Sequence, residues 1–96
     1  MAVEFYPADD KNQKNFLFQL TDSDFEKLQD VLVEYKKRTG LTIDRYKTTR
    51  IHEGHVKLLV ELTEKILANI HRPDLQLIQI KEKFKGNIKD LIAVGD

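Results

Sequence analysis

The stretch "LTDSDFEKLQDVLVEYKKRTG", residues 20–40, carries the clearest structural boundary in this chain. Thr21 is a residue type preferred at a helix N-cap, and Asp24 stands three positions later, where a capping box normally has Glu or Gln. Leu20 and Phe25 occupy the two positions of a hydrophobic staple, which fixes the angle at which the chain enters a helix. These signals together predict that a helix begins directly after Thr21.

The same stretch has the apolar spacing of an amphipathic helix. Its apolar residues recur at three- and four-residue steps, so that one stripe faces a core; they are Phe25, Leu28, Val31, Leu32 and Tyr35. Gly40 follows the basic residues "KKRT", and a glycine in the left-handed conformation commonly ends a helix. We therefore predict a helix from about residue 22 to residue 39.

Upstream of this helix, two short segments have the composition of β-strands. "VEFYP" is rich in β-favouring residues and stops at Pro7, which lacks the N–H that a central strand requires. In "FLFQL", Phe16, Phe18 and Leu20 alternate, and we expect all three to share one face. The polar stretch "ADDKNQKN" separates the two segments. They predict an N-terminal antiparallel β-hairpin.

Downstream, "HVKLLVELTEKILANI", residues 55–70, predicts a second amphipathic helix. Its main apolar stripe contains Val56, Leu59, Val60, Thr63, Ile66, Leu67 and Ile70. Leu58 and Leu62 widen the apolar arc, so we expect this helix to be central to the fold or, as the alternative, to supply an interface. Pro73 blocks its continuation.

The tail, "PDLQLIQIKEKFKG", permits two interpretations. A helix capped by Asp74 and ending at Gly86 would turn Leu77, Ile80 and Phe84 inward, whereas a strand would alternate Leu75 and Leu77 with Gln. Helix is favoured, because Pro suits a helix start and the apolar spacing extends beyond strand length. The final "LIAVG" is short and apolar, which favours a buried strand.

These segments add up to an α+β fold in a single small domain, residues 1–96. It consists of an N-terminal β-hairpin, two to three amphipathic helices and a short C-terminal strand that joins the sheet. The chain has 96 residues and no Cys, which excludes disulfides and thiolate chemistry. It shows no signal peptide and no apolar run long enough for a membrane span, so we expect a cytoplasmic protein without membrane contact.

The segment "TIDRYKTTRIHEGH", residues 42–55, lacks helical or strand rhythm and is dense in polar side chains. It begins extended, because Leu41 and Ile43 alternate with polar residues and should pin the segment to the core. "KTTR" offers hydroxyl groups for a turn or for capping the second helix. An ordered loop rich in Tyr, Arg and Thr is typical of protein-recognition surfaces. The residues expected to bind a partner are Asp44, Arg45, Tyr46, Lys47, Thr49, Arg50, His52 and His55.

The 16 basic and 16 acidic side chains balance in total, but an acidic and a basic segment follow one another along the sequence. Residues 1–35 contain three basic and eight acidic side chains, and residues 36–57 contain seven basic and two acidic ones. The helix dipole accounts for Lys36, Lys37 and Arg38 at the end of the first helix. The basic region 36–57 leaves a nucleic-acid-binding domain as the alternative function, which would use Lys36, Lys37, Arg38, Arg45, Lys47 and Arg50.

Chemistry in the connector is the less favoured interpretation. "HEGH" differs from the zinc-protease motif H-E-x-x-H, because His52 and His55 are three residues apart and a Gly lies between them. No Ser, Thr or Lys stands in the frame of a known nucleophile motif, and the scattered glycines form no phosphate-binding loop. A small metal-dependent enzyme around the two His therefore remains the third hypothesis, and we expect no enzyme, no bound metal and no cofactor.

The expected function is that of a small non-catalytic protein-binding module. In size, mixed α+β pattern, balanced charge and lack of a catalytic motif, the chain resembles in type the small bacterial proteins that bind and neutralise a toxin. That resemblance implies an immunity or inhibitor protein whose partner is a toxin. Self-association of the chain is the alternative way of using the same surface.

Overall fold

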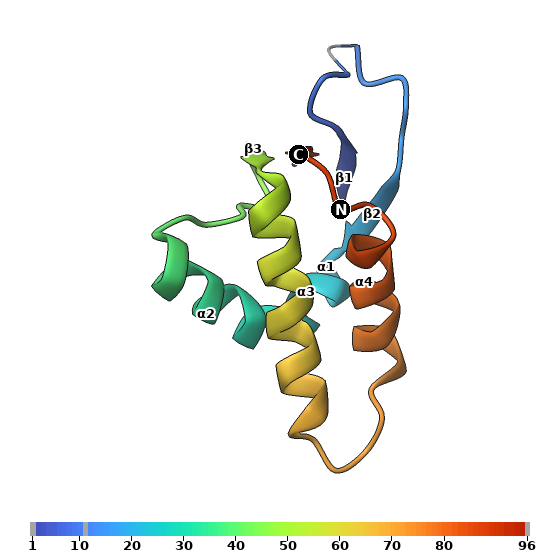
Figure 1. Ribbon diagram of the computed structural model, residues 1–96. Coiled ribbons are helices and arrows are strands. Elements are labelled where there is room, and N and C mark those ends of the chain that lie inside the picture. The colour runs from blue at the N-terminus through green and yellow to red at the C-terminus, as the bar shows by residue number, and fades with distance from the viewer. Residues whose placement is uncertain (1, 11, 96) are drawn as a thin grey trace.

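The computed structural model describes residues 2–10 and 12–95. Strands and helices follow one another along the chain as shown in Figure 1. They are β1 (Ala2–Pro7), β2 (Phe18–Thr21), α1 (Asp22–Lys27), α2 (Gln29–Thr39), β3 (Thr48–Ile51), α3 (Glu53–Ala68), α4 (Leu75–Lys85) and β4 (Leu91–Val94). The predicted α+β fold is confirmed.

The four strands form one antiparallel sheet in the order β2-β1-β4-β3. The predicted hairpin is β1 and β2, with Phe5 opposite Phe18. The predicted C-terminal strand is β4, which lies between β1 and β3, so the two ends of the chain meet in the middle of the sheet. In Figure 1, α3 and α4 extend from the sheet in one direction and the β1–β2 loop extends in the other.

The connector contains a strand that the sequence did not reveal. The sequence shows no strand rhythm in residues 42–55, but Thr48–Ile51 form β3 at the edge of the sheet. Ile51 is the buried apolar residue of this strand, and the two Thr have the β-branched side chains that favour extended backbone. Pairing with β4 thus decides the conformation of a segment too short and too polar to show a strand pattern.

The predicted helix over residues 22–39 is divided at Leu28. Thr21 caps it as expected: its Oγ1 accepts from the Asp24 amide at 3.2 Å, while Asp24 Oδ2 accepts from the Thr21 amide at 2.9 Å. At Leu28, ψ is −1°, and there α1 ends and α2 begins. The division has a tertiary reason, because α1 packs against β2 and α4 whereas α2 packs against α3. Gly40 ends α2 with φ of 74°, in the left-handed conformation.

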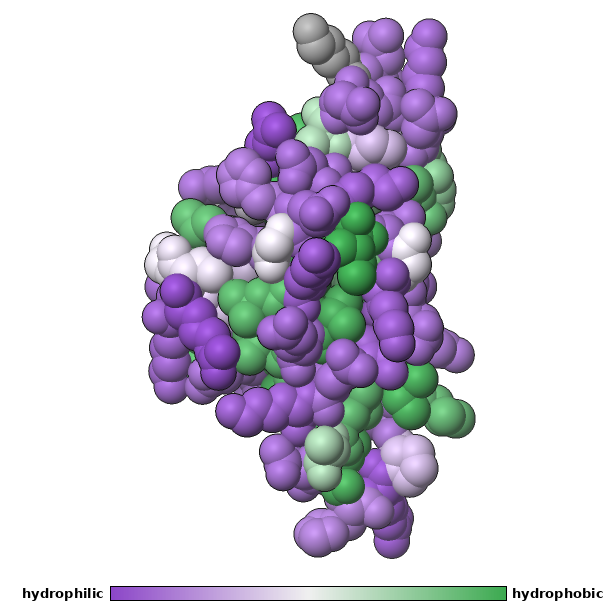
Figure 2. Space-filling model, in the orientation of Figure 1, coloured by the Kyte–Doolittle hydropathy of each residue, from purple (hydrophilic) through white to green (hydrophobic). Residues whose placement is uncertain are grey.

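The central helix, α3, packs against both α2 and α4. It begins two residues earlier than predicted and ends before Ile70, which is exposed and therefore does not continue the buried stripe. Leu62, on the shoulder of that stripe, is buried. In Figure 2, hydrophobic residues gather over the middle of the drawn face, where α3 lies between α2 and α4. The expectation of a broadly apolar, central helix is confirmed.

The N-terminus of α3 is capped differently from the prediction. The N-cap residue is His52, which makes no side-chain capping bond, and the Thr residues of "KTTR" lie in β3 instead. The carboxylate of Asp90 accepts from the Glu53 amide at 2.7 Å. A residue just before β4 therefore supplies the acceptor that the helix start needs, and this contact joins positions 37 residues apart.

The tail is the predicted helix, and the strand alternative is wrong. In α4, Leu77, Ile80 and Phe84 are buried, as the three-four spacing required. The Asp74 Oδ1 caps the helix by accepting from the Leu77 amide at 3.0 Å, and its Oδ2 meets the Lys27 ammonium at 3.0 Å. The ion pair thus links the N-cap residue of α4 to the last residue of α1.

One core lies between the sheet and the helices, and two expectations about it are wrong. Phe16 is 51% exposed instead of sharing the inner face with Phe18 and Leu20, because β2 begins only at Phe18. Leu41 is 44% exposed, so of the two residues expected to hold the start of the connector to the core only Ile43 does so. No helix among the described residues is long and apolar enough to cross a membrane.

The cap at Asp74 makes a pH-dependent contribution to stability. The hydrogen bond from the Leu77 amide, and then the one from Lys27, hold the pKa of this carboxyl below its ordinary value of 3.8. A carboxyl whose pKa is lower in the folded state than in the unfolded state stabilises the fold at pH values above its unfolded-state pKa. This stabilisation is lost as the pH falls through the folded-state pKa. We expect Asp74→Asn, which keeps a capping oxygen but no charge, to be less stable than the wild type at pH 7, and the gap to shrink at about pH 3. Urea unfolding at both pH values measures the gap; an equal gap at both would contradict this role.

Candidate functional site

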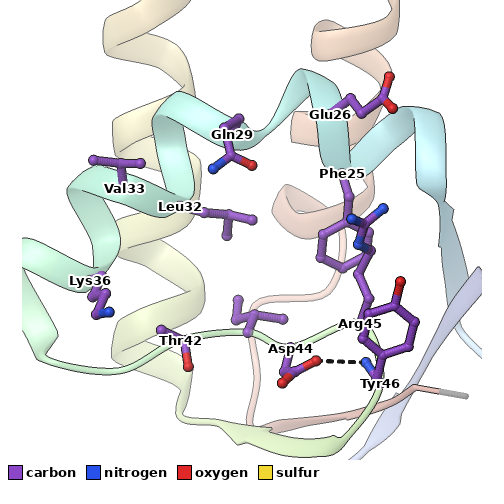
Figure 3. A pocket seen from close by; sticks show the side chains of 11 residues that line it. Phe25, Glu26, Gln29, Leu32, Val33, Lys36, Thr42, Asp44, Arg45 and Tyr46 are labelled. Atoms are coloured by element: carbon purple, nitrogen blue, oxygen red, sulfur yellow. Dashed lines mark hydrogen bonds between the residues drawn. The ribbon is translucent and has the colours of Figure 1, made fainter.

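The first part of the connector, residues 42–46, borders a groove on α1 and α2. The groove has a volume of about 520 Å³. Figure 3 shows it with α1 and α2 along one side and the connector along the other. Its lining residues are Phe25, Glu26, Gln29, Leu32, Val33, Lys36, Thr42, Ile43, Asp44, Arg45 and Tyr46. We call this hollow the connector groove.

The connector groove has apolar walls that remain open to solvent. Val33 of α2 is 43% exposed and Tyr46 of the connector is 60% exposed. Leu32 is partly buried against the core, and Ile43 is buried. In Figure 3, Lys36 lies near one end of the groove, and Arg45 and Tyr46 lie near the other. The groove thus combines an apolar floor with charged ends.

Arg45 ties the connector to α1. Its guanidinium Nη1 lies 3.3 Å from the Asp22 Oδ1, which makes an ion pair on the surface. Its Cζ lies 5.9 Å from the ring centroid of Phe25 and 5.9 Å from that of Tyr46. Both distances are within the range of cation–π attraction. Arg45 therefore positions the Tyr46 ring instead of extending freely into solvent.

Two further contacts fix the backbone on either side of Tyr46. The Asp44 Oδ1 accepts from the Tyr46 amide at 2.8 Å, which is the pattern of an Asx-turn. The Gly95 amide donates to the Lys47 carbonyl at 3.1 Å, which extends the β3–β4 ladder by one residue. Tyr46 is thus an exposed aromatic side chain on an ordered turn.

The second part of the predicted binding segment faces elsewhere. In β3, Ile51 points into the core, so by alternation Thr49 shares its face and Arg50 points to the opposite face of the sheet. The Arg50 Nη2 lies 3.6 Å from the Asp90 Oδ2. The strand therefore separates Arg50 from the groove that holds Asp44, Arg45 and Tyr46.

The two histidines lie at the start of α3. His52 is the exposed N-cap residue and His55 lies in the first turn. Their ring centroids are 6.0 Å apart, and the His55 Nδ1 lies 3.3 Å from the Tyr35 hydroxyl, whose pKa is raised by burial. Within residues 2–10 and 12–95, no group of three His, Cys, Asp or Glu side chains is placed to hold a metal ion.

Several cations of the basic segment, residues 36–57, lie beside acidic side chains in the structure. Arg45 pairs with Asp22, and Arg50 pairs with Asp90. Lys37 lies 3.6 Å from Glu34 on the same helix. Carboxylates thus lie beside three of the seven cations of residues 36–57, and two of these carboxylates, Asp22 and Asp90, come from other parts of the chain.

The α2 wall of the groove is the part of the site that sequence reasoning missed. Val33 lies outside the buried stripe of its helix, and Gln29 and Lys36 flank it. An apolar residue off the buried stripe of a helix was the available signal, because such a position is normally polar. Which segment lies opposite this wall depends on the tertiary fold.

Comparisons with protein families, with curated protein sequences and with solved structures found no match to this chain.

Proposed function

We propose that this protein is a non-catalytic binding module, and that the connector groove receives a segment of another protein. The observation that carries the proposal is the exposed apolar strip of Val33, Leu32 and Tyr46 beside charged groups. Recognition surfaces commonly combine an apolar centre with a polar rim. Tyr and Arg are also the residues most enriched among those that contribute most to protein binding.

The order of the connector supports a binding role. The Asx-turn at Asp44 and the contacts of Arg45 hold Tyr46 before any partner arrives. A side chain that is already ordered loses little conformational entropy on binding. The turn therefore provides an anchor that a flexible loop of the same composition would lack.

Charge pairing favours a protein partner over a nucleic acid. A phosphate backbone is bound by cations that exchange their counterions for phosphate. Here Asp22 lies beside Arg45 and Asp90 lies beside Arg50, so the surface around these two cations is not strongly basic. A partner protein that fills an apolar groove does not require a strongly basic surface.

The concrete form of the proposal is an immunity or inhibitor protein that works in the cytoplasm and neutralises a partner protein, such as a toxin. A protein with this role needs a surface that occludes its partner and no reaction centre. The product of an adjacent gene is therefore the first partner to test, by isothermal titration calorimetry with the two purified proteins.

Two substitutions test the groove. Tyr46→Ala removes the exposed aromatic wall and Arg45→Ala removes the group that positions it, so each should weaken partner binding by more than about 1 kcal/mol. Arg72→Ala is the matched control, since Arg72 is exposed in the turn between α3 and α4. Affinity should stay unchanged in this control.

Equal affinity of the wild type and both groove variants for the partner would contradict the proposal that the connector groove binds it. Binding that falls steeply with salt and extends to mixed-sequence oligonucleotides would instead identify a nucleic-acid-binding domain. Circular dichroism of each variant separates loss of binding from loss of folding.

A further inference from the structure

The face of the sheet turned away from the helices has an unusual composition. Val3, Phe5, Phe18, Leu20, Ile51, Leu91 and Ala93 belong to the core and mark the inner face. By alternation, the opposite face carries Glu4 and Tyr6 of β1, Ile92 and Val94 of β4, and Thr48 and Arg50 of β3, with Gln19 of β2 beside them. We call this the open face. Tyr6 is buried, with 7% of its surface exposed, whereas Ile92 and Val94 are partly exposed.

The register places the apolar side chains of the open face next to each other. Ile92 lies directly opposite Tyr6 on one side and directly opposite Arg50 on the other. Val94 lies in the same way between Glu4 and Thr48. Directly paired residues have Cβ atoms about 5 Å apart, so the two partly exposed β4 side chains make one patch beside the buried Tyr6.

The β1–β2 loop enlarges this patch. Its Phe16 is 51% exposed, and the ring packs edge-on against Tyr6 with centroids 6.1 Å apart. Along a strand of an antiparallel sheet, hydrophobic residues on the core face normally alternate with polar residues on the solvated face. Here both central strands carry apolar side chains on that face. Such a patch, edged by polar groups, is typical of an interaction site.

The charges on either side of the patch are opposite. Glu4 lies on β1 and Arg50 on β3, with β4 between them. Two strand spacings and two residues of offset put their Cα atoms about 12 Å apart, and both side chains project from the same face of the sheet instead of toward each other. Each charge therefore stands at its own edge of the apolar centre, and both are exposed.

We infer that the open face binds a second copy of this chain, giving a twofold dimer in which two sheets stack. A twofold axis parallel to the strands and over β4 brings β1 of one copy above β3 of the other. Arg50 of each copy then approaches Glu4 of its partner, while Ile92 and Val94 meet their equivalents. Such an interface is self-complementary, as an isologous contact requires, and stacked sheets pack about 10 Å apart.

The dimer should be weak. Four strands of about four residues cover on the order of 300 Å² per copy, below the roughly 800 Å² per partner of a stable complex. The existing Arg50–Asp90 pair is half-exposed and is no obstacle, because exposed ion pairs contribute about 0–1 kcal/mol. We expect a dissociation constant of about 10–100 μM.

A charge swap measured by sedimentation equilibrium tests the dimer. The wild type should approach twice the 11.2 kDa mass of one chain as its concentration rises. Arg50→Glu and Glu4→Arg should each weaken association at least about tenfold, since each opposes like charges, and the double variant should recover to within about threefold of the wild type. Lys57→Glu makes the same charge change on an exposed position of α3 and should leave association unchanged.

Three results would overturn the inference: a wild type that stays monomeric to about 1 mM, single variants that associate like the wild type, or a double variant that stays weak. Circular dichroism confirms that each variant is folded. The groove lies elsewhere on the molecule, so Tyr46→Ala should not change dimerisation, and failure of either proposal leaves the other to be judged on its own test.

Discussion

Phe84→Ala should lower the free energy of unfolding by about 3–5 kcal/mol, the usual cost of removing a buried Phe side chain. Phe84 joins α4 to the hairpin: its ring lies 5.5 Å from that of Phe5 and 5.3 Å from that of Phe18, edge-on to both. Phe5 and Phe18 themselves stack at 4.5 Å. Truncation therefore leaves a cavity between α4 and two strands, where the backbone can collapse only in part.

Urea unfolding followed by circular dichroism measures this loss. A domain of this size loses roughly 4–8 °C in melting temperature per kcal/mol, so the variant should melt at least about 12 °C below the wild type. Phe16→Ala is the matched control, because this ring is half-exposed on the open face; it should cost less than about 1 kcal/mol at concentrations where the chain is monomeric. Equal losses in the two variants would contradict the assignment of the core.

Gly95→Ala should cost about 1–3 kcal/mol, as overpacking does, and should disturb the connector groove. A Cβ at this position would lie 2.6 Å from the Arg45 carbonyl carbon and 2.9 Å from the Lys47 amide nitrogen. Both atoms belong to the backbone of the turn that carries Tyr46. The turn must therefore move, or the end of β4 must leave it.

Amide chemical shifts at residues 44–47, recorded together with urea unfolding, separate these effects from a general loss of stability. Gly54→Ala is the control: no atom lies within 4 Å of a Cβ built there, and the position is helical. Alanine is the better helix former, so this change should be neutral or stabilising by up to about 1 kcal/mol. Unchanged shifts and a cost under about 0.5 kcal/mol for Gly95→Ala would contradict a close contact.

Most of the fold could be predicted because its boundaries are set by local interactions. The capping box at Thr21, the left-handed Gly40 and the cap at Asp74 each act within a few residues. The buried stripes of the helices follow from spacing alone. The division at Leu28 could not be predicted, because it depends on α1 and α2 packing against different elements.

The candidate site was predicted less completely. The connector was singled out by its composition, and it does border the groove with Asp44, Arg45 and Tyr46. Its residues do not act as one surface, however, because β3 turns Arg50 to the opposite face of the sheet. Strand pairing with β4 decides this, and β4 lies more than 40 residues further along the chain.

The sequence by itself determined the start of α1 after Thr21, the end of α2 at Gly40 and the cap of α4 at Asp74, which helix faces are apolar, and that the chain builds an α+β domain. These properties follow from hydrogen bonds and side-chain spacing over distances of three to five residues. Only the tertiary structure decided the edge strand in the connector, the Asp90 cap on α3, and the pairing of Arg45 with Asp22. Each of these joins residues far apart in the chain, and no local pattern records which distant group will arrive beside them.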